Sequence, residues 1–134
     1  PRIFTYSTPL PPAVLRTNHA ALRHVARAPD RGATLLAQAE ELRHFLQSLG
    51  LSTGQSQSQI IPILLGESQK ALTAQAFLQE HGVFVPAIRP PTVPQGQARL
   101  RLSLRADLDS EHWEQLKTAL TALAHWLQST AQEA

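Results

Sequence analysis

The sequence of 134 residues has no cysteine and no methionine, and only 5% of its residues are aromatic. Without cysteine the chain has no disulfide, no thiolate zinc site and no cysteine nucleophile. The few aromatic residues and a net charge of only +2 argue against a nucleic-acid partner, which needs a stronger basic field or base-stacking rings. No apolar run approaches the roughly 20 residues of a membrane span. We therefore expect a cytoplasmic protein that binds neither nucleic acid nor membrane.

The sequence also lacks an initiator methionine, because its first residue is Pro1. We expect that either a leader has been removed or the sequence belongs to a longer protein. The composition is 43% hydrophobic and 16% charged, which is typical of a folded globule with a core. The length fits a single domain over residues 1–134.

Apolar spacing, prolines and glycines divide the chain into strands and helices. The expected elements are a strand at 2–8, helices at 12–28 and 33–49, a strand at 59–65, a helix from about 66 to 81, strands at 83–88 and 98–104, and a helix from Asp109 or Ser110 to about 127. Pro62 suggests that its strand lies at a sheet edge or contains a bulge. This order predicts an α+β fold in which a small antiparallel sheet has helices packed mainly on one face.

The most informative segment is a proline-rich loop at 89–97, followed by a strand with alternating arginines and leucines. Prolines stiffen the loop, and side chains alternate faces along a strand. Arg99, Arg101 and Arg105 are therefore predicted on one face. Guanidinium groups held this way suit a carboxylate or phosphate. The alternative is an antiparallel edge with a merely solvated, charged face.

Other chemistry finds little support in the sequence. The six histidines lack the spacing of a metal site, and no His-Glu-x-x-His motif occurs. The serines fall mostly in the polar stretch 52–58, and no Gly-x-Ser-x-Gly motif is present. We therefore predict no metal ligands and no catalytic residue within this chain.

Two segments carry a family resemblance. Residues 58–104 contain Ile-Arg-Pro-Pro-Thr-Val-Pro at 88–94 and Ala-Arg-Leu-Arg-Leu at 98–102, and residues 4–13 read Phe-Thr-Tyr-Ser-Thr-Pro-Leu-Pro-Pro-Ala. Both segments resemble the C-terminal domain of the α-oxoamine synthases, which are pyridoxal-phosphate enzymes of the fold-type-I aminotransferase class. The Ile-Arg-Pro-Pro-Thr-Val-Pro motif points to the 8-amino-7-oxononanoate synthase branch.

The resemblance implies a function and a set of contacts. Enzymes of this branch join L-alanine to a pimeloyl thioester with loss of CO₂, in biotin biosynthesis. The family pattern assigns substrate contacts to Arg89 and Thr92, and it makes Arg101 the partner of the amino-acid or product carboxylate. Ser7 or Thr8 resembles the hydroxyl that reaches the cofactor phosphate across a dimer. The parent enzyme is thus expected to be a homodimer that uses pyridoxal 5′-phosphate.

One departure limits what this chain is expected to do alone. The chemistry requires a lysine that forms a Schiff base, whereas Lys70 and Lys117 fall on predicted helices outside the family's lysine motif. We expect the chain by itself to be inactive and to hold no tightly bound cofactor. Its expected partner is the missing larger domain, joined by residues 1–50, with 51–134 as the small domain. The alternative is a free-standing ligand-binding or protein-interaction module.

Overall fold

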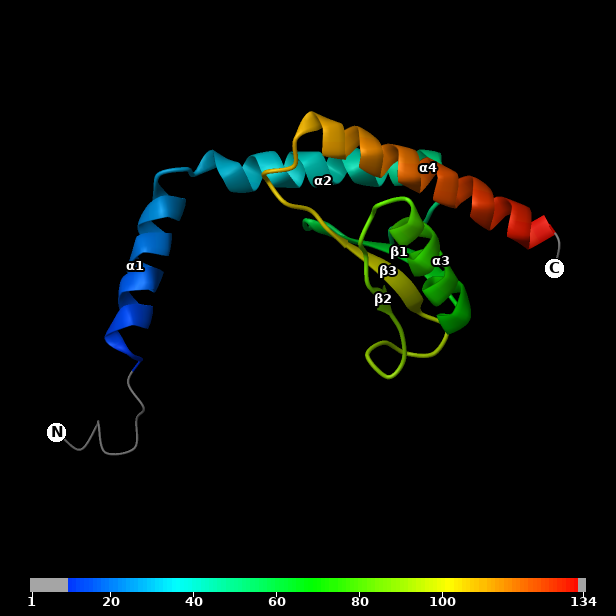
Figure 1. The fold of residues 1–134 in the computed structure, drawn as a ribbon, viewed down its shortest axis with the longest axis horizontal. Helices are drawn as coiled ribbons and strands as arrows, with labels where there is room; N and C mark the ends of the chain where they lie inside the picture. Colours follow the sequence, from blue (N-terminus) through cyan, green and yellow to red (C-terminus); the bar gives the residue numbers. More distant parts are fainter. Residues whose placement is uncertain (1–9, 133–134) are drawn as a thin grey trace. The chain divides into compact units, whose positions relative to one another are not determined.

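The computed structural model describes residues 10–132, and the chain packs as two compact units, residues 1–32 and residues 33–134 (Figure 1). The helix of the first unit, α1, spans Pro12–Ala26, close to its prediction. Pro12 occupies its first turn, where a fixed φ suits the helix and no N–H is missed. No residue of α1 is buried. The strand predicted at 2–8 lies outside the described residues.

The remaining elements build the second unit, apart from the first three residues of α2, which belong to the first unit. They are α2 (Asp30–Ser48), β1 (Ile60–Gly66), α3 (Ser68–Glu80), β2 (Ala87–Ile88), β3 (Ala98–Ser103) and α4 (Ser110–Gln132). The chain divides near residue 32 rather than after residue 50, because α2 buries Ala39, Leu42 and Leu46 in the same core as the sheet. That residues 1–50 join a further domain stays a prediction.

The helix ends follow the signals in the sequence. Gly50 has a φ of +78°, and the N–H of Leu51 donates to the carbonyl of Leu46 at 3.0 Å, which closes the end of α2. At the start of α4, the Asp109 carboxylate accepts the N–H of His112 at 2.9 Å, as an N-cap does. α4 continues past its predicted end near residue 127 to Gln132.

The sheet is antiparallel with strand order β1–β3–β2, so β3 is its central strand. Pro62 lies on the edge strand β1 opposite Arg101, and the register shifts between Leu64 and Gly66. The prediction that this strand lies at an edge or contains a bulge is therefore confirmed. An edge position suits proline, because it has no N–H to donate to a second neighbouring strand.

Strand β2 covers only two of the six residues predicted at 83–88. Pro86 contributes no N–H, and its carbonyl accepts the N–H of Arg101 at 3.0 Å. The N–H of Ala87 donates to the side-chain oxygen of Gln75 on α3 at 2.7 Å. The N–H of Val83 is used to cap α3 by bonding Leu78 at 2.8 Å. The bond to Pro86 continues the pairing of β2 with β3, whereas the bond of Val83 belongs to the end of α3.

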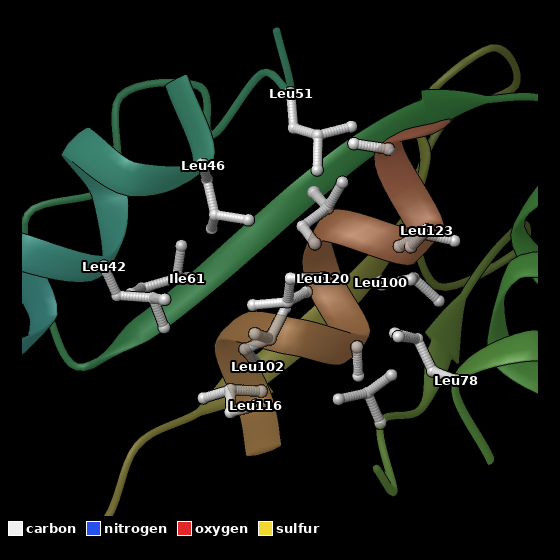
Figure 2. Packing of buried hydrophobic residues seen from close by; sticks show 14 of the residues in the cluster. Leu42, Leu46, Leu51, Ile61, Leu78, Leu100, Leu102, Leu116, Leu120 and Leu123 are labelled. Carbon is white, nitrogen blue, oxygen red and sulfur yellow. The ribbon is translucent and has the colours of Figure 1, made fainter. Parts of the chain in front are cut away.

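The core lies between one face of the sheet and the helices. On β3 the buried residues Ala98, Leu100 and Leu102 alternate with Arg99 and Arg101. In Figure 2, leucines of α2, α3 and α4 converge on the buried face of β1 and β3. The labelled residues are Leu42, Leu46, Leu51, Ile61, Leu78, Leu100, Leu102, Leu116, Leu120 and Leu123. The predicted α+β fold with helices on one face of the sheet is confirmed.

One charged side chain is buried at the edge of this core. Arg43 of α2 is 6% exposed. Its Nε donates to Glu40 at 2.9 Å, its Nη2 forms an ion pair with the same carboxylate, and its Nη1 donates to the carbonyl of Ser58 at 2.8 Å. Buried charges persist when they are paired and hydrogen-bonded in this way. The hydrogen bonds from Arg43, and to a lesser extent its charge and that of His44, lower the pKa of Glu40 below its ordinary value of 4.5.

We predict that Leu100→Ala lowers the free energy of unfolding by about 2–5 kcal/mol, because it leaves a cavity in a fully buried site. Phe84→Ala removes a larger side chain that is 82% exposed, and it should change the free energy by no more than about 0.5 kcal/mol. Urea denaturation measures both values. Equal effects of the two substitutions would contradict this description of the core.

A second prediction concerns acid stability. A carboxyl group whose pKa is lowered by folding stabilises the folded state above its unfolded pKa, and this contribution is lost as the pH falls through the folded pKa. Glu40 should therefore contribute to a loss of stability below pH 4.5. We expect Glu40→Gln to reduce the drop in unfolding free energy between about pH 6 and about pH 3, measured by urea denaturation at each pH. Glu80→Gln, an exposed change on α3, serves as the control, and an equal reduction there would contradict the assignment.

Candidate functional site

The face of the sheet opposite the helices bears an open concavity of about 760 Å³. Its floor includes Ile60, Pro62 and Leu64 of β1. The loop before β1 and the proline-rich loop before β3 contribute its walls. Its further lining residues are Gly54, Gln55, Ser56, Ser58, Gly66, Ile88, Thr92, Val93, Gly96, Gln97, Arg99 and Arg101. Among residues 10–132, the charged residues of this lining are Arg99 and Arg101. Their positive charge favours an anionic ligand.

Arg101 lies in the middle of the central strand, and its N–H donates to the carbonyl of Pro86, just before β2, at 3.0 Å. Its Cα pairs with that of Pro62, and its side chain is exposed in the concavity. Within residues 10–132 its guanidinium has no hydrogen-bonding or ion-pairing partner. The planar group can therefore donate two parallel hydrogen bonds to a carboxylate or phosphate from outside.

Arg99 lies on the same face but is already engaged. Its Nε donates to the carbonyl of Gln97 at 2.9 Å, and its Nη2 donates to the side-chain oxygen of Gln97 at 3.0 Å. It is half-buried and lines the same concavity. Arg99 thus adds positive charge, while fewer of its donors remain for a ligand.

Arg105 does not join the other two arginines. Strand β3 ends at Ser103, and the alternation that predicted a shared face ends with it. Arg105 instead donates to both carboxylate oxygens of Asp107, at 3.0 and 2.6 Å, and both side chains are exposed. The hydrogen bonds from Arg105 are the main reason that the pKa of Asp107 is lowered. The predicted row of three arginines is therefore wrong at its last member.

The proline-rich loop brings one of its two predicted site residues to the concavity. Thr92 lines it, and the N–H of Thr92 donates to the carbonyl of Arg89 at 3.1 Å, which closes a turn. The side chain of Arg89 is exposed and does not line the concavity. Ser7 and Thr8 lie outside the described residues. The structure thus brings Thr92 and Arg101 together and leaves Arg89 apart.

Sequence reasoning missed Arg43, which was not singled out as a site residue. A signal was present, because Ala39, Arg43 and Leu46 follow one another at helical spacing within an apolar stripe. A charge at such a position is either buried with partners or lies at the edge of the stripe. Arg43 is buried, and its partner Ser58 lines the concavity.

Neither lysine of the chain reaches this site. Lys70 is exposed on α3, and Lys117 on α4 forms an ion pair with Glu114 at 2.6 Å. No cluster of three possible metal ligands occurs among residues 10–132, and no helix there is long and apolar enough to cross a membrane. The described chemistry of the concavity is therefore that of an anion site with an apolar floor.

Comparison with known proteins identifies the family of the chain. The model of the family "Aminotransferase class I and II" matches residues 1–120. An 8-amino-7-oxononanoate synthase of Anaeromyxobacter dehalogenans is 42% identical over 122 residues, which cover 91% of this chain and 31% of the relative. A Magnetococcus marinus protein provisionally named for the same synthase is 44% identical over 117 residues, with 87% and 30% covered. The chain thus spans about 30% of the length of these relatives.

Solved structures share the fold. A serine palmitoyltransferase of Sphingomonas wittichii superposes with a TM-score of 0.78 at 30% identity, covering 90% of this chain and 31% of that one. An 8-amino-7-oxononanoate synthase of Francisella tularensis gives a TM-score of 0.77 at 24% identity, covering 94% and 36%. The resemblance inferred from the motifs is confirmed by these matches. The chain belongs to the class I and II aminotransferase family, and 8-amino-7-oxononanoate synthases are among its relatives.

Proposed function

We propose that this chain is the C-terminal part of a pyridoxal-phosphate-dependent α-oxoamine synthase of the 8-amino-7-oxononanoate type, and that it binds the carboxylate of the amino-acid substrate or product. The proposed reaction of the whole enzyme is the decarboxylative condensation of L-alanine with a pimeloyl thioester. The relatives' names and the shared fold support this reaction class.

The observation that carries the proposal is the environment of Arg101. Its guanidinium is exposed in a concavity and has no partner within residues 10–132, and its backbone belongs to the central strand. A charge-assisted, bidentate bond to a carboxylate both binds and orients the ligand. Placement on a strand with hydrogen-bonded neighbours on each side limits how far the group can move, which favours precise positioning of a substrate.

The rest of the concavity fits an amino acid or its acylated product. Apolar side chains of Ile60, Pro62 and Leu64 lie beside the arginines, so a small apolar group attached to the carboxylate would contact carbon rather than charge. Thr92 adds a hydroxyl that can donate or accept a hydrogen bond. We propose that Arg89, on the same loop outside the concavity, contacts another part of the substrate in the complete enzyme.

The cofactor requires residues that this concavity does not contain. Pyridoxal phosphate, which the family uses, is held as a Schiff base with a lysine. Lys70 and Lys117 both lie on helices away from the concavity. The described residues therefore do not fit covalent attachment of the cofactor, and the proposed role of this chain is confined to the substrate. The proposed phosphate contact by Ser7 or Thr8 concerns residues outside the described range.

The proposed partner is the larger part of the same enzyme. Helix α1 exposes Val14, Leu15, Leu22 and Val25, which are 40–69% accessible. Apolar side chains gathered on one helix are typical of a surface that packs against another element. We propose that this surface meets the larger domain, and that the complete enzyme is a cytoplasmic homodimer.

A free-standing carboxylate-binding module is the second candidate. One observation favours it: every residue that lines the concavity comes from residues 54–101 of this one chain. The two candidates differ in how strongly the isolated chain binds, since a module would bind its ligand tightly without the rest of a synthase, whereas a part of the synthase would bind a carboxylate only weakly.

We predict the effect of Arg101→Ala in a full-length synthase assembled by joining this chain to the remainder of the Anaeromyxobacter relative. A hydrogen bond to a charged group contributes about 1.5–3 kcal/mol, so the KM for the amino acid should rise about 10- to 150-fold. Cofactor binding, measured from its absorbance, should be retained. Arg101→Lys should recover only part of the loss, because an ammonium group cannot reproduce the planar fork.

Arg105→Ala is the matched control, since Arg105 binds Asp107 outside the concavity. It should leave the KM nearly unchanged. Equal small effects of Arg101→Ala and Arg105→Ala would contradict the proposal and favour a merely solvated arginine face.

A separate prediction concerns the isolated chain and pyridoxal phosphate. Because the concavity contains no lysine, borohydride reduction of the mixture should give no stoichiometric adduct at a single site. Peptide mass mapping of the reduced protein measures this. Stoichiometric labelling of Lys70 or Lys117 would show that the chain carries its own cofactor site.

A further inference from the structure

The loop of residues 52–59, which links α2 to β1, forms one wall of the concavity through Gly54, Gln55, Ser56 and Ser58. Helices and strands hold their shape by backbone bonding, whereas a polar loop needs bonds to its surroundings. The position of this wall relative to Arg101 therefore depends on what ties the loop down.

Backbone bonds connect the two ends of the loop to the sheet. The carbonyl of Ser52 accepts the N–H of Leu64 at 2.9 Å, and the carbonyl of Gln59 accepts the N–H of Leu104 at 3.0 Å. Helix α2 holds the loop from the other side through side chains. Gln47 donates to the buried hydroxyl of Thr53 at 3.4 Å, which is long for a hydrogen bond, and Arg43 donates to the carbonyl of Ser58 at 2.8 Å. The bond from Arg43 is the shorter of the two, and it is charge-assisted.

The geometry requires a guanidinium at position 43. Nε and Nη2 of Arg43 engage the Glu40 carboxylate, which leaves Nη1 directed at Ser58. Glu40 is also held from the other side, where its second oxygen lies 3.0 Å from Nε2 of His44. The two contacts of Arg43 with Glu40 and its bond to Ser58 together fix the orientation of the guanidinium. A lysine has a single charged atom and cannot reproduce this arrangement.

We propose that Arg43, oriented by Glu40, is a positioning residue that fixes the wall formed by residues 54–58 and so sets the affinity of the Arg101-containing concavity for carboxylate ligands. Ser58 precedes β1 by two residues, and Pro62 of β1 pairs with Arg101. A shift of the wall therefore changes the shape of the concavity that Arg101 also lines. This inference rests on the proposed carboxylate site, and it adds a residue that touches no ligand.

The test uses the whole chain labelled with ¹⁵N, titrated with hexanoate as a simple carboxylate with an apolar tail. Amide shifts at Arg101 and at residues 54–58 give the Kd, and amide hydrogen exchange reports how firmly the loop is held. Arg43→Lys should weaken hexanoate binding about 2- to 10-fold, the effect of one lost hydrogen bond. It should also accelerate exchange in the loop but not in α4.

Two controls separate positioning from general stability. Leu42→Val reduces packing at a neighbouring, fully buried position of α2, and it should lower the unfolding temperature without changing the Kd. His44→Ala removes the exposed second partner of Glu40 and leaves the bond from Arg43 to Ser58 in place, so it should raise the Kd less than Arg43→Lys does, and an equal rise would contradict the role of Arg43. If Arg43→Lys does not fold, Glu40→Gln at its half-exposed site tests the same arrangement, with a smaller effect in the same direction.

The outcomes distinguish this inference from the proposed function. Lack of saturable binding by the unsubstituted chain, or binding that survives Arg101→Ala, overturns the carboxylate site and the inference with it. Binding that is lost in Arg101→Ala but unchanged in Arg43→Lys overturns the positioning role alone. A Kd that rises equally in Leu42→Val also overturns it, because the effect would then follow stability.

Discussion

The alternation of side chains along β3 is the constraint on which the rest of this structure depends. Leu100 and Leu102 point into the core, while Arg99 and Arg101 point to the open face. Because the period of a strand is two, a slip of one residue against β1 would exchange these faces. Burying two guanidinium groups without partners would cost far more than the leucines contribute. Formation of the core and formation of the arginine site are therefore the same event.

Because the core and the arginine face form together, a site that is lined largely by loops still has a defined position on the sheet. The arginine that we propose as the ligand contact stands on a central strand with neighbours on both sides, and the loops only complete its surroundings. One loop is stiffened by its own prolines at 90, 91 and 94. The other lacks proline and is tied to α2 by the buried guanidinium of Arg43. Two different physical devices thus hold the two walls.

Under the proposed function, the chemistry is divided along the chain. The relatives are about three times as long as the match, and the described residues of this chain place no lysine in the concavity. Recognition of a carboxylate needs a cationic side chain beside apolar side chains, and the small sheet supplies both. Covalent attachment of a cofactor needs a lysine beside it, so under this proposal the attachment belongs to another part of the enzyme.

The sequence by itself determined the helices, the two long strands and the alternation of Arg99 and Arg101 with the leucines of β3, because periodicity, caps and turn residues act over a few neighbouring positions. The family resemblance also rested on contiguous motifs. Tertiary structure decided what depends on distant partners. Gln75 on α3 accepts a hydrogen bond from the N–H of Ala87, and the carbonyl of Ser58, 15 residues along the chain from Arg43, accepts a hydrogen bond from its buried guanidinium. Such hydrogen bonds form only after helix and sheet have packed together, so the helical spacing marks Arg43 as unusual but does not identify its partner.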